Sequence, residues 1–329
     1  MGDAPFRLLA DIGGTNVRFA LLPPRSDQPQ RERSLRCADY PGLEQAARAY
    51  LADAGSPRVT EAAIDVATAV TGDLVKLTNS PWAFSIEQTR RQLGLARLLV
   101  LNDFTALALS LPLLSATELR QVGRGQALAG KAIGLIGAGT GLGVSGLLPC
   151  GARWVPLEGE GGHVAFSPGD AREDAVLALL RERFGHVSAE RVLSGPGVVN
   201  VYQALCRIDH VPTRALEPEQ IAQAALSGAD PQCVEALAMF CGALGTAAGN
   251  LAITRGARSG LYIGGGIVPK LGDYFERSSF RARFEHKGRF SSYLAGIPTF
   301  VILADYPALR GLAVALNDFP SPPAGEGRG

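Results

Sequence analysis

The stretch Asp11-Ile-Gly-Gly-Thr-Asn-Val-Arg18 predicts a strand that runs into a tight glycine turn and returns as a second strand. Apolar runs flank it on both sides, from Phe6 to Ala10 and from Phe19 to Leu22. In such a turn the backbone N–H groups and the hydroxyl of Thr15 can surround a phosphate group. The carboxylate of Asp11 would then stand at the mouth of the turn, where a metal ion on that phosphate would lie.

A related glycine turn recurs further along the chain, in Gly137-Ala-Gly-Thr-Gly-Leu-Gly143. It lies between a strand predicted over Lys131–Gly137 and a returning strand predicted over Leu142–Leu148. The second copy is one residue longer, which a β-bulge would accommodate. Either turn alone could be no more than a tight hairpin. Together they predict two phosphate clamps on two lobes and a nucleotide held in the cleft between them.

The glycine spacing of Gly137–Gly143 also resembles a dinucleotide-binding fingerprint, which alone is a weak indication. The turn of a Rossmann fold opens a helix, whereas Leu142–Leu148 alternates like a strand. The chain contains no Gly-x-x-x-x-Gly-Lys-Ser/Thr sequence, so a P-loop is not expected.

The length of 329 residues predicts two lobes, and 47% apolar with 19% charged residues is typical of a globular protein with a large core. A formal net charge of +1 gives no electrostatic reason to expect nucleic acid or an acidic membrane as a partner. The sequence has neither a long uninterrupted apolar run nor a basic-then-apolar leader, so a membrane span and export are not expected. Five scattered cysteines without a Cys-x-x-Cys pair predict free thiols in a reducing cytoplasm.

Alternating strands and helices predict two α/β domains. We expect a small domain from residues 1–112 together with about 302–320, a large domain from 113–301, and a disordered tail from 321–329. A long helix is predicted from Pro231 to Thr254. A strand over Leu261–Ile263 is followed by Gly264-Gly265-Gly266, and one further helix is expected from there through Phe275.

The sequence Asn102-Asp103-Phe104 lies where a predicted strand, Leu98–Leu101, meets a predicted helix. An acid at the carboxyl end of a strand, facing a cleft, is well placed to take a proton from a substrate hydroxyl. Asp103 could instead be only the N-cap of the helix, since Asp is a common capping residue. The phosphate clamp nearby favours catalysis over capping.

The loop Gly159-Glu160-Gly-Gly-His163 presents a carboxylate and an imidazole with little steric obstruction, so the pair could hydrogen-bond to adjacent hydroxyls of a sugar. A metal site would lack a third ligand at suitable spacing, and a surface turn with a structural His163 is a further alternative. By composition alone, Glu190 is an ordinary acid in the first turn of a short helix. Asn79 and Trp82 could contact a sugar, but Trp82 could equally belong to the core.

Taken together, these motifs resemble one family, the bacterial glucokinases of the hexokinase superfamily. The resemblance covers the chain from Asp11 to about Leu316. It rests on Asp11-Ile-Gly-Gly-Thr-Asn16, Thr78-Asn-x-x-Trp-Ala-Phe-Ser85, Asn102-Asp-Phe-Thr-Ala106, Gly137–Gly143, Gly159-Glu-Gly-Gly-His-Val164, Ser188-Ala-Glu-Arg-Val-Leu-Ser-Gly-Pro-Gly197 and Phe284-Glu-x-Lys-Gly-Arg-Phe290. The related ROK sugar kinases carry a cysteine-rich zinc motif after their Gly-His. Here Ala165-Phe-Ser-Pro168 follows instead, so the chain resembles the non-ROK glucokinases and no zinc is expected.

The resemblance implies a two-lobed actin-like ATPase fold, which is a duplicated ribonuclease H-like α/β fold of the hexokinase type with a cleft between the lobes. It implies that Asp103 is the general base and that Asp11 holds Mg²⁺ through water. The implied sugar ligands are Asn102, Asp103, Glu160, His163, Glu190 and Asn79. The implied ATP ligands are Asp11, Gly13, Gly14, Thr15, Asn16, Gly139, Thr140, Gly141, Gly264, Gly265 and Gly266.

The expected function is ATP-dependent phosphorylation of D-glucose at its 6-hydroxyl, which gives glucose 6-phosphate for glycolysis in the cytoplasm. Glucose and ATP are the expected partners, with Mg²⁺ as cofactor and without nucleic acid or membrane; a homodimer is what the family suggests. Alternatives are a kinase for another hexose, a sugar-sensing regulator and a polymerising actin-like ATPase. A regulator of this fold would usually carry a basic helix-turn-helix before the first strand, where this chain has only a few residues. A polymerising ATPase would have no need of Glu160, His163 and Glu190.

Overall fold

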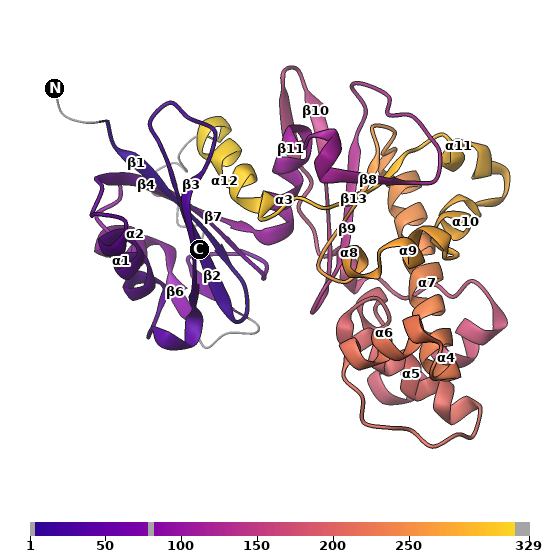
Figure 1. The fold of residues 1–329 in the computed structure, drawn as a ribbon. Coiled ribbons are helices and arrows are strands. Elements are labelled where there is room, and N and C mark those ends of the chain that lie inside the picture. The colour runs from indigo at the N-terminus through magenta and orange to yellow at the C-terminus, as the bar shows by residue number, and fades with distance from the viewer. Residues whose placement is uncertain (1–3, 78–81, 320–329) are drawn as a thin grey trace. The chain divides into compact units, whose positions relative to one another are not determined.

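The computed structural model describes residues 4–77 and 82–319 of the chain. The chain forms two compact units, which we call the first unit (Met1–Leu114 with Ala304–Gly329) and the second unit (Ser115–Leu303). It therefore leaves the first unit after Leu114 and returns to it at Ala304 (Figure 1).

A five-stranded sheet in the order β3-β2-β1-β4-β7 forms the centre of the first unit. Its strands are β1 (Phe6–Ile12), β2 (Asn16–Leu22), β3 (Gln30–Arg36), β4 (Val59–Val66) and β7 (Arg97–Asn102). Strands β1, β4 and β7 are parallel, while β1–β2 and β2–β3 are antiparallel hairpins. A separate two-stranded sheet consists of β5 (Leu74–Lys76) and β6 (Ala83–Ser85).

Helices pack on both faces of the five-stranded sheet: α1 (Leu43–Asp53), α2 (Ile86–Gln92), α3 (Asp103–Ser110) and α12 (Pro307–Asp318). Leu8, Ala10 and Ile12 of β1 share a buried cluster with residues of α1. Because neighbouring strand residues point to opposite faces, Leu9 and Asp11 lie on the other face, where α12 packs on β1 and β4.

The close approach of α12 to α3 depends on a glycine. A Cβ atom added at Gly311 of α12 would lie only 1.7 Å from the carbonyl oxygen of Ala106 in α3. The absence of a side chain at this position lets the two helix backbones come into contact. Since α3 begins at Asp103, this contact helps to fix the start of the helix that carries the predicted catalytic residue.

A six-stranded sheet in the order β11-β10-β9-β12-β13-β8 forms the centre of the second unit. Its strands are β8 (Leu119–Val122), β9 (Ile133–Ala138), β10 (Leu142–Cys150), β11 (Arg153–Pro156), β12 (Leu261–Gly264) and β13 (Thr299–Ile302). Strands β9, β12 and β13 are parallel, and β10 and β11 follow β9 as antiparallel hairpins. The order β11-β10-β9-β12-β13 thus repeats β3-β2-β1-β4-β7, so the two units share one α/β topology.

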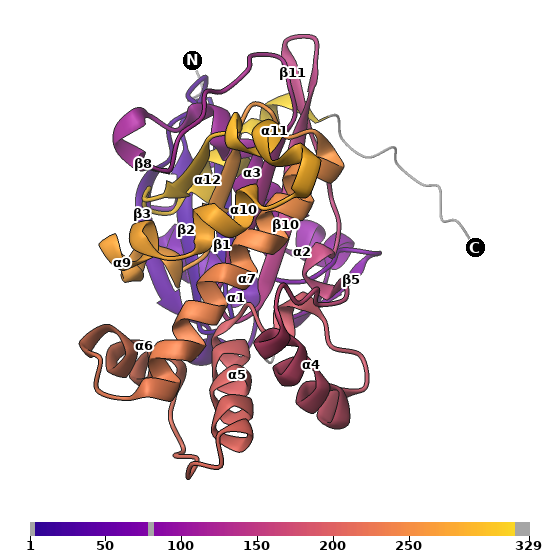
Figure 2. The ribbon, with the colours of Figure 1, turned by 90° about the vertical axis from the view of Figure 1, so that its right-hand side faces the viewer.

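The helices of the second unit surround the long helix α7 (Figure 2). They are α4 (Ala171–Phe184), α5 (Gly195–Ile208), α6 (Pro218–Ser227), α7 (Pro231–Arg255), α8 (Val268–Leu271), α9 (Asp273–Arg277), α10 (Phe280–Glu285) and α11 (Ser291–Ala295). The side chains of Asp170, Ser194 and Asp230 accept backbone N–H groups in the first turns of α4, α5 and α7. These capping bonds explain where the three helices begin.

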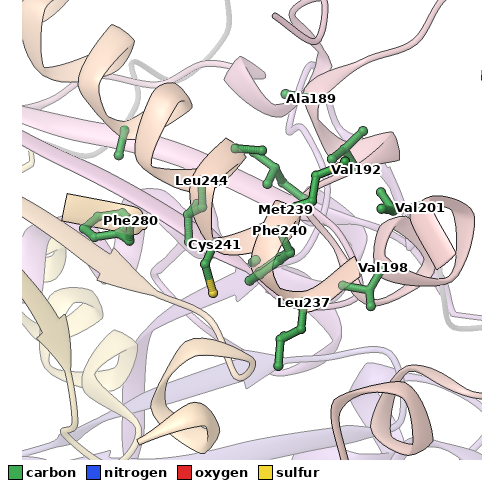
Figure 3. Packing of buried hydrophobic residues seen from close by; sticks show 14 of the residues in the cluster. Ala189, Val192, Val198, Val201, Leu237, Met239, Phe240, Cys241, Leu244 and Phe280 are labelled. Carbon is green, nitrogen blue, oxygen red and sulfur yellow. The ribbon is translucent and has the colours of Figure 1, made fainter. Parts of the chain in front are cut away.

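Helix α7 is long and apolar enough to cross a membrane, judged by length and composition alone, but most of it is buried inside the second unit. It packs against α5, α6 and α10. Figure 3 shows Leu237, Met239, Phe240 and Leu244 of α7 among the buried residues of the core. Burial of each large apolar side chain contributes about 1.5–3 kcal/mol, so the buried residues of α7 stabilise the core of this unit.

Two details of the predicted elements are wrong. The hairpins at both glycine turns are confirmed, but the second does not contain the expected bulge: β9 and β10 pair without a register shift, and the two turns differ in length. The single helix expected through Phe275 is divided into α8 and α9. Gly272 between them has a φ of 52°, a conformation that interrupts an α-helix.

Candidate active site

The glycine turn of the first unit connects β1 to β2. The N–H of Gly13 donates to the carbonyl oxygen of Asn16 at 2.9 Å, which closes the turn, and the carbonyl oxygen of Thr15 accepts the N–H of Cys37 at 2.9 Å. Gly14 and the Thr15 side chain are exposed. The turn is therefore held by backbone bonds at its base while its tip is open to a ligand.

Asp11 lies near the end of β1, two residues before Gly13 of this turn. Its Oδ2 lies 3.2 Å from Nη1 of Arg18, the residue that pairs with it across the β1–β2 hairpin. The guanidinium of Arg18 in turn lies over the ring of Tyr306, 4.5 Å from its centroid. The carboxylate is thus oriented by a cation that is itself held by an aromatic ring.

The structure distinguishes the roles of Asn102 and Asp103. Asn102 is the N-cap of α3: its Oδ1 accepts the N–H groups of Phe104 at 2.9 Å and Thr105 at 3.4 Å. Asp103 is the first residue of the helix, and its Oδ1 also accepts the N–H of Phe104 at 2.9 Å. The capping role considered for Asp103 therefore belongs to its neighbour. The Asp103 carboxylate lies half-buried at the carboxyl end of β7.

Asp65 of β4 is a third acid at this edge that the sequence motifs did not indicate. It pairs in register with Asp11 on β1, it is completely buried, and neither of its carboxyl oxygens has a hydrogen-bond donor among the described residues. Burial raises the pKa of Asp65 well above its usual range, and the charges of Asp11 and Asp103 raise it further. The two neighbouring carboxylates are predicted functional residues, and Asp65 can donate a hydrogen bond to Asp11 when it is protonated.

The glycine turn of the second unit connects β9 to β10 in the same way. The N–H of Gly139 donates to the carbonyl oxygen of Gly141 at 2.8 Å, and Thr140 at the tip is exposed. Gly264–Gly266, the glycines predicted to lie by adenosine, are next to this turn. A Cβ atom at Gly265 would be 2.3 Å from the carbonyl oxygen of Ala138, at the end of β9. Gly265 also has a φ of 78°, which only glycine adopts without strain.

The predicted sugar ligands of the second unit surround the same turn. Glu160 and His163 flank a 3-10 turn (Gly161–His163), with Oε2 and Nε2 separated by 3.9 Å and both side chains more than half exposed. A Cβ atom at Gly162 would lie 2.1 Å from the carbonyl oxygen of Leu142, so this loop packs on the start of β10. Glu190, in another 3-10 turn (Ala189–Arg191), accepts the N–H of Leu142 at 2.9 Å.

The predicted residues therefore form two groups. The first unit brings together Asp11, the turn Gly13–Asn16, Asn102 and Asp103. The second unit brings together the turn Gly139–Gly141, Gly264–Gly266, Glu160, His163 and Glu190. Asn79 lies outside the described residues. Trp82 is a core residue rather than an exposed sugar platform, since its ring is buried and its Nε1 donates to the carbonyl oxygen of Tyr40.

Comparison with known proteins gives consistent results. The model of the family described as Glucokinase matches residues 8–319. A glucokinase from Aromatoleum aromaticum is 56% identical over 95% of each chain, and one from Chromobacterium violaceum is 52% identical over 96% of this chain and 90% of its own. The crystal structure of a glucokinase from an Antarctic psychrotroph superimposes with a TM-score of 0.86 at 33% identity, covering 97% of this chain and 100% of that one.

Two α/β units of matching topology, each with a glycine turn between a parallel strand and the antiparallel strand that follows it, define a sugar kinase of the actin-like ATPase fold. The fold class expected from the sequence is thereby confirmed. The chain belongs to the glucokinase family. It is an enzyme that phosphorylates glucose with ATP, which confirms the predicted activity.

Proposed function

We propose that Asp103 is the general base in transfer of the γ-phosphoryl group of ATP to the 6-hydroxyl of glucose. The observation that supports this role is the position of its carboxylate, fixed by the Phe104 N–H at the carboxyl end of β7. In α/β folds this edge of a parallel sheet is the usual place for ligands. Phosphoryl transfer through a loose transition state needs the base only late, so Asp103 can act in its ionised form.

For the sugar, we propose hydroxyl contacts from Asn102, Glu160, His163 and Glu190, and from Asn79. The Oδ1 of Asn102 is engaged in capping α3, so its Nδ2 is the atom assigned to a hydroxyl. Among the residues that the structure describes, this Nδ2 has only a long contact to the Thr68 carbonyl oxygen, at 3.4 Å. Glu160 and His163 are exposed and close together, which suits binding of two adjacent hydroxyls.

For the nucleotide, we propose that the two glycine turns bind the phosphates and that Gly264–Gly266 lies beside adenosine. The phosphates would contact Gly13, Gly14, Thr15 and Asn16 in one unit and Gly139, Thr140 and Gly141 in the other. In both turns the tip is exposed and the backbone is held by hydrogen bonds at the base. Successive backbone N–H groups in such turns form concave sites that bind anions.

The residues present fit Mg²⁺ held by Asp11 through water. Mg²⁺ prefers oxygen ligands, keeps several waters and binds mainly to the phosphates of its nucleotide, so one carboxylate is sufficient. Arg18 engages Oδ2 of Asp11, and Oδ1 is the oxygen assigned to a metal-bound water. The described residues contain no group of three acidic, His or Cys side chains suited to hold a metal directly. When bound, Mg²⁺ would neutralise charge on the phosphates.

Replacement of Asp103 by Asn tests the assignment. The variant keeps the shape of the side chain and an oxygen for the Phe104 N–H, but it has no base. We expect kcat to fall by about 10²–10⁴-fold with little change in the KM for glucose, measured in a coupled assay with ATP and Mg²⁺. Asp39→Asn, at an exposed acid of the first unit, is the matched control and should behave as wild type. Near-normal turnover of Asp103→Asn would refute the role.

We also propose that the enzyme works in the cytoplasm as a homodimer, with Mg-ATP and glucose as its partners. Its net charge of +1 provides no general attraction to nucleic acid or anionic lipid. Light scattering at several protein concentrations would test the dimer, and a monomer at every concentration would refute it.

A further inference from the structure

We propose that Glu190 is a positioning residue that couples the sugar site to the nucleotide site, with one carboxylate oxygen on the β9–β10 turn and the other on a sugar hydroxyl. The inference rests on the proposed function, in which Glu190 binds glucose and Gly139–Gly141 binds the phosphates of ATP. It adds a direct physical link between the two sites within the second unit.

The link is the contact of Glu190 with the end of the turn. Its Oε2 accepts the backbone N–H of Leu142, the residue after Gly141, at 2.9 Å. A hydrogen bond from an N–H to a carboxylate is about twice as strong as one between neutral groups. Within the part of the chain that the structure describes, Oε1 accepts no hydrogen bond. One oxygen therefore holds the turn while the other remains available for a hydroxyl.

The backbone at Glu190 is firmly anchored, so only its side chain can respond to a ligand. Ala189 and Val192, on either side of it, are buried in the core beside Met239 (Figure 3). The carbonyl oxygen of Glu190 accepts the hydroxyl of Ser194 at 2.8 Å, and Ser194 caps α5.

The turn is anchored to the same region from its other end. The N–H of Gly195, the first residue of α5, donates to the carbonyl oxygen of Gly139 at 2.8 Å. Together with the bond from Leu142 to Glu190, this fixes both ends of the turn to one segment of chain. A sugar that fixes the Glu190 side chain thereby also fixes the second anchor of the nucleotide turn.

The expected coupling is positive. Binding of either substrate immobilises the Glu190 side chain, so the second substrate binds a site that is already ordered. By thermodynamic linkage, glucose must raise the affinity for nucleotide by the same factor by which nucleotide raises the affinity for glucose. We expect a factor of about 5 or more, within the usual range for coupled sites.

Two glycines of the turn provide a matched test. A Cβ atom at Gly141 would lie 2.6 Å from Oε2 of Glu190, whereas a Cβ atom at Gly139 would meet nothing within 4 Å. Gly141→Ala therefore displaces the Glu190 carboxylate, and Gly139→Ala is the control in the same turn. With calorimetric titration of glucose in the absence of nucleotide, we expect Gly141→Ala to raise Kd by about 5-fold or more, and Gly139→Ala to leave it within about 2-fold.

A second measurement examines the coupling itself. Glucose is titrated with and without a non-hydrolysable ATP analogue and Mg²⁺, in wild type and in Glu190→Asp. The shorter side chain keeps its charge but cannot span the turn and the sugar together, so the coupling factor should fall to about 1. Thermal unfolding of each variant shows whether it is folded.

The outcomes separate the two proposals. A wild-type protein that does not bind glucose would overturn the proposed function and this inference together. Normal glucose binding with equal Kd values for Gly141→Ala and Gly139→Ala would overturn only the coupling role of Glu190. A wild-type coupling factor of 1 would also overturn the coupling role, because the two sites would then bind independently. A factor below 1 would overturn it as well, because binding at one site would then weaken binding at the other.

Discussion

At the scale of single residues, Asp65 is the least expected feature of the molecule. A buried carboxyl group that has no hydrogen-bond donor among the described residues destabilises a protein if it is ionised, because the charge is removed from water. If Asp65 keeps its proton, it avoids this cost and can donate a hydrogen bond to Asp11.

The protonation of Asp65 predicts how stability depends on pH. Its pKa is raised in the folded protein, so below about pH 4 both folded and unfolded states hold the proton and no penalty arises. Above that pH the unfolded chain releases the proton first, and the free energy of unfolding falls as pH rises towards the folded pKa. Asp65→Asn should remove this fall, by up to about 1.4 kcal/mol per pH unit, and should be more stable than wild type near neutral pH.

Urea unfolding at several pH values checks this expectation. The difference between Asp65→Asn and wild type should shrink towards zero at about pH 4. A difference that stays constant with pH would show that folding does not raise the pKa of Asp65. Asp73→Asn, at an exposed acid of the same unit, is a control for the general effect of removing one charge.

At the scale of elements, hydrophobic pattern and capping residues predicted most of the structure, and the exceptions have physical causes. The strand β3, Gln-Arg-Glu-Arg-Ser-Leu-Arg, was missed because it is an exposed edge strand and has no apolar face. The division of α8 from α9 was missed because apolar periodicity continues across Gly272. Asp65 was missed as a functional residue because a single acid inside an apolar strand belongs to no motif; the polar residue in that apolar run was the available signal.

The packing of α12 on α3 predicts that Gly311→Ala lowers the free energy of unfolding, although helix propensity alone predicts an increase. Gly311→Ala should stabilise α12 by about 1 kcal/mol if only helix propensity mattered. The new methyl group would instead collide with the carbonyl oxygen of Ala106 and force the helices apart. We expect a net loss of about 1–3 kcal/mol in the free energy of unfolding, measured in urea.

Gly72→Ala is the matched control in the same unit, because its added Cβ would have no neighbour within 4 Å. It should change stability by no more than about 1 kcal/mol. A Gly311→Ala variant as stable as Gly72→Ala would mean that α3 and α12 can separate without loss.

At the scale of the whole molecule, the path of the chain makes the first unit depend on both ends of the sequence. Its last helix, α12, brings Leu309, Leu312 and Leu316 into the buried interior, and the Leu316 carbonyl oxygen accepts Nη1 of Arg97 at 3.0 Å. The two repeated hairpins, β1–β2 and β9–β10, were predictable from the two glycine turns. The hydrogen bond from the Leu142 N–H to Glu190 could not be predicted, because the two residues are far apart in the sequence and no motif connects them.

Deletion of residues 304–329 should therefore unfold the first unit selectively. The exposed apolar surface left by α12 would make that unit accessible to protease, while the second unit, which keeps all its strands, stays protected. Limited proteolysis followed by mass spectrometry would show fragments that begin near Ser115. Removal of only residues 320–329 is the control. Equal protection of both units in the longer deletion would show that α12 is dispensable.

Trp82 provides a means to follow the two units separately. The sequence contains only two tryptophans, and the other, Trp154, lies half-buried in β11 of the second unit. Each unit thus carries a single tryptophan, and the buried Trp82 emits from an apolar environment until the first unit opens. Trp82→Phe leaves an emission spectrum that reports on the second unit alone, and Trp154→Phe leaves one that reports on the first.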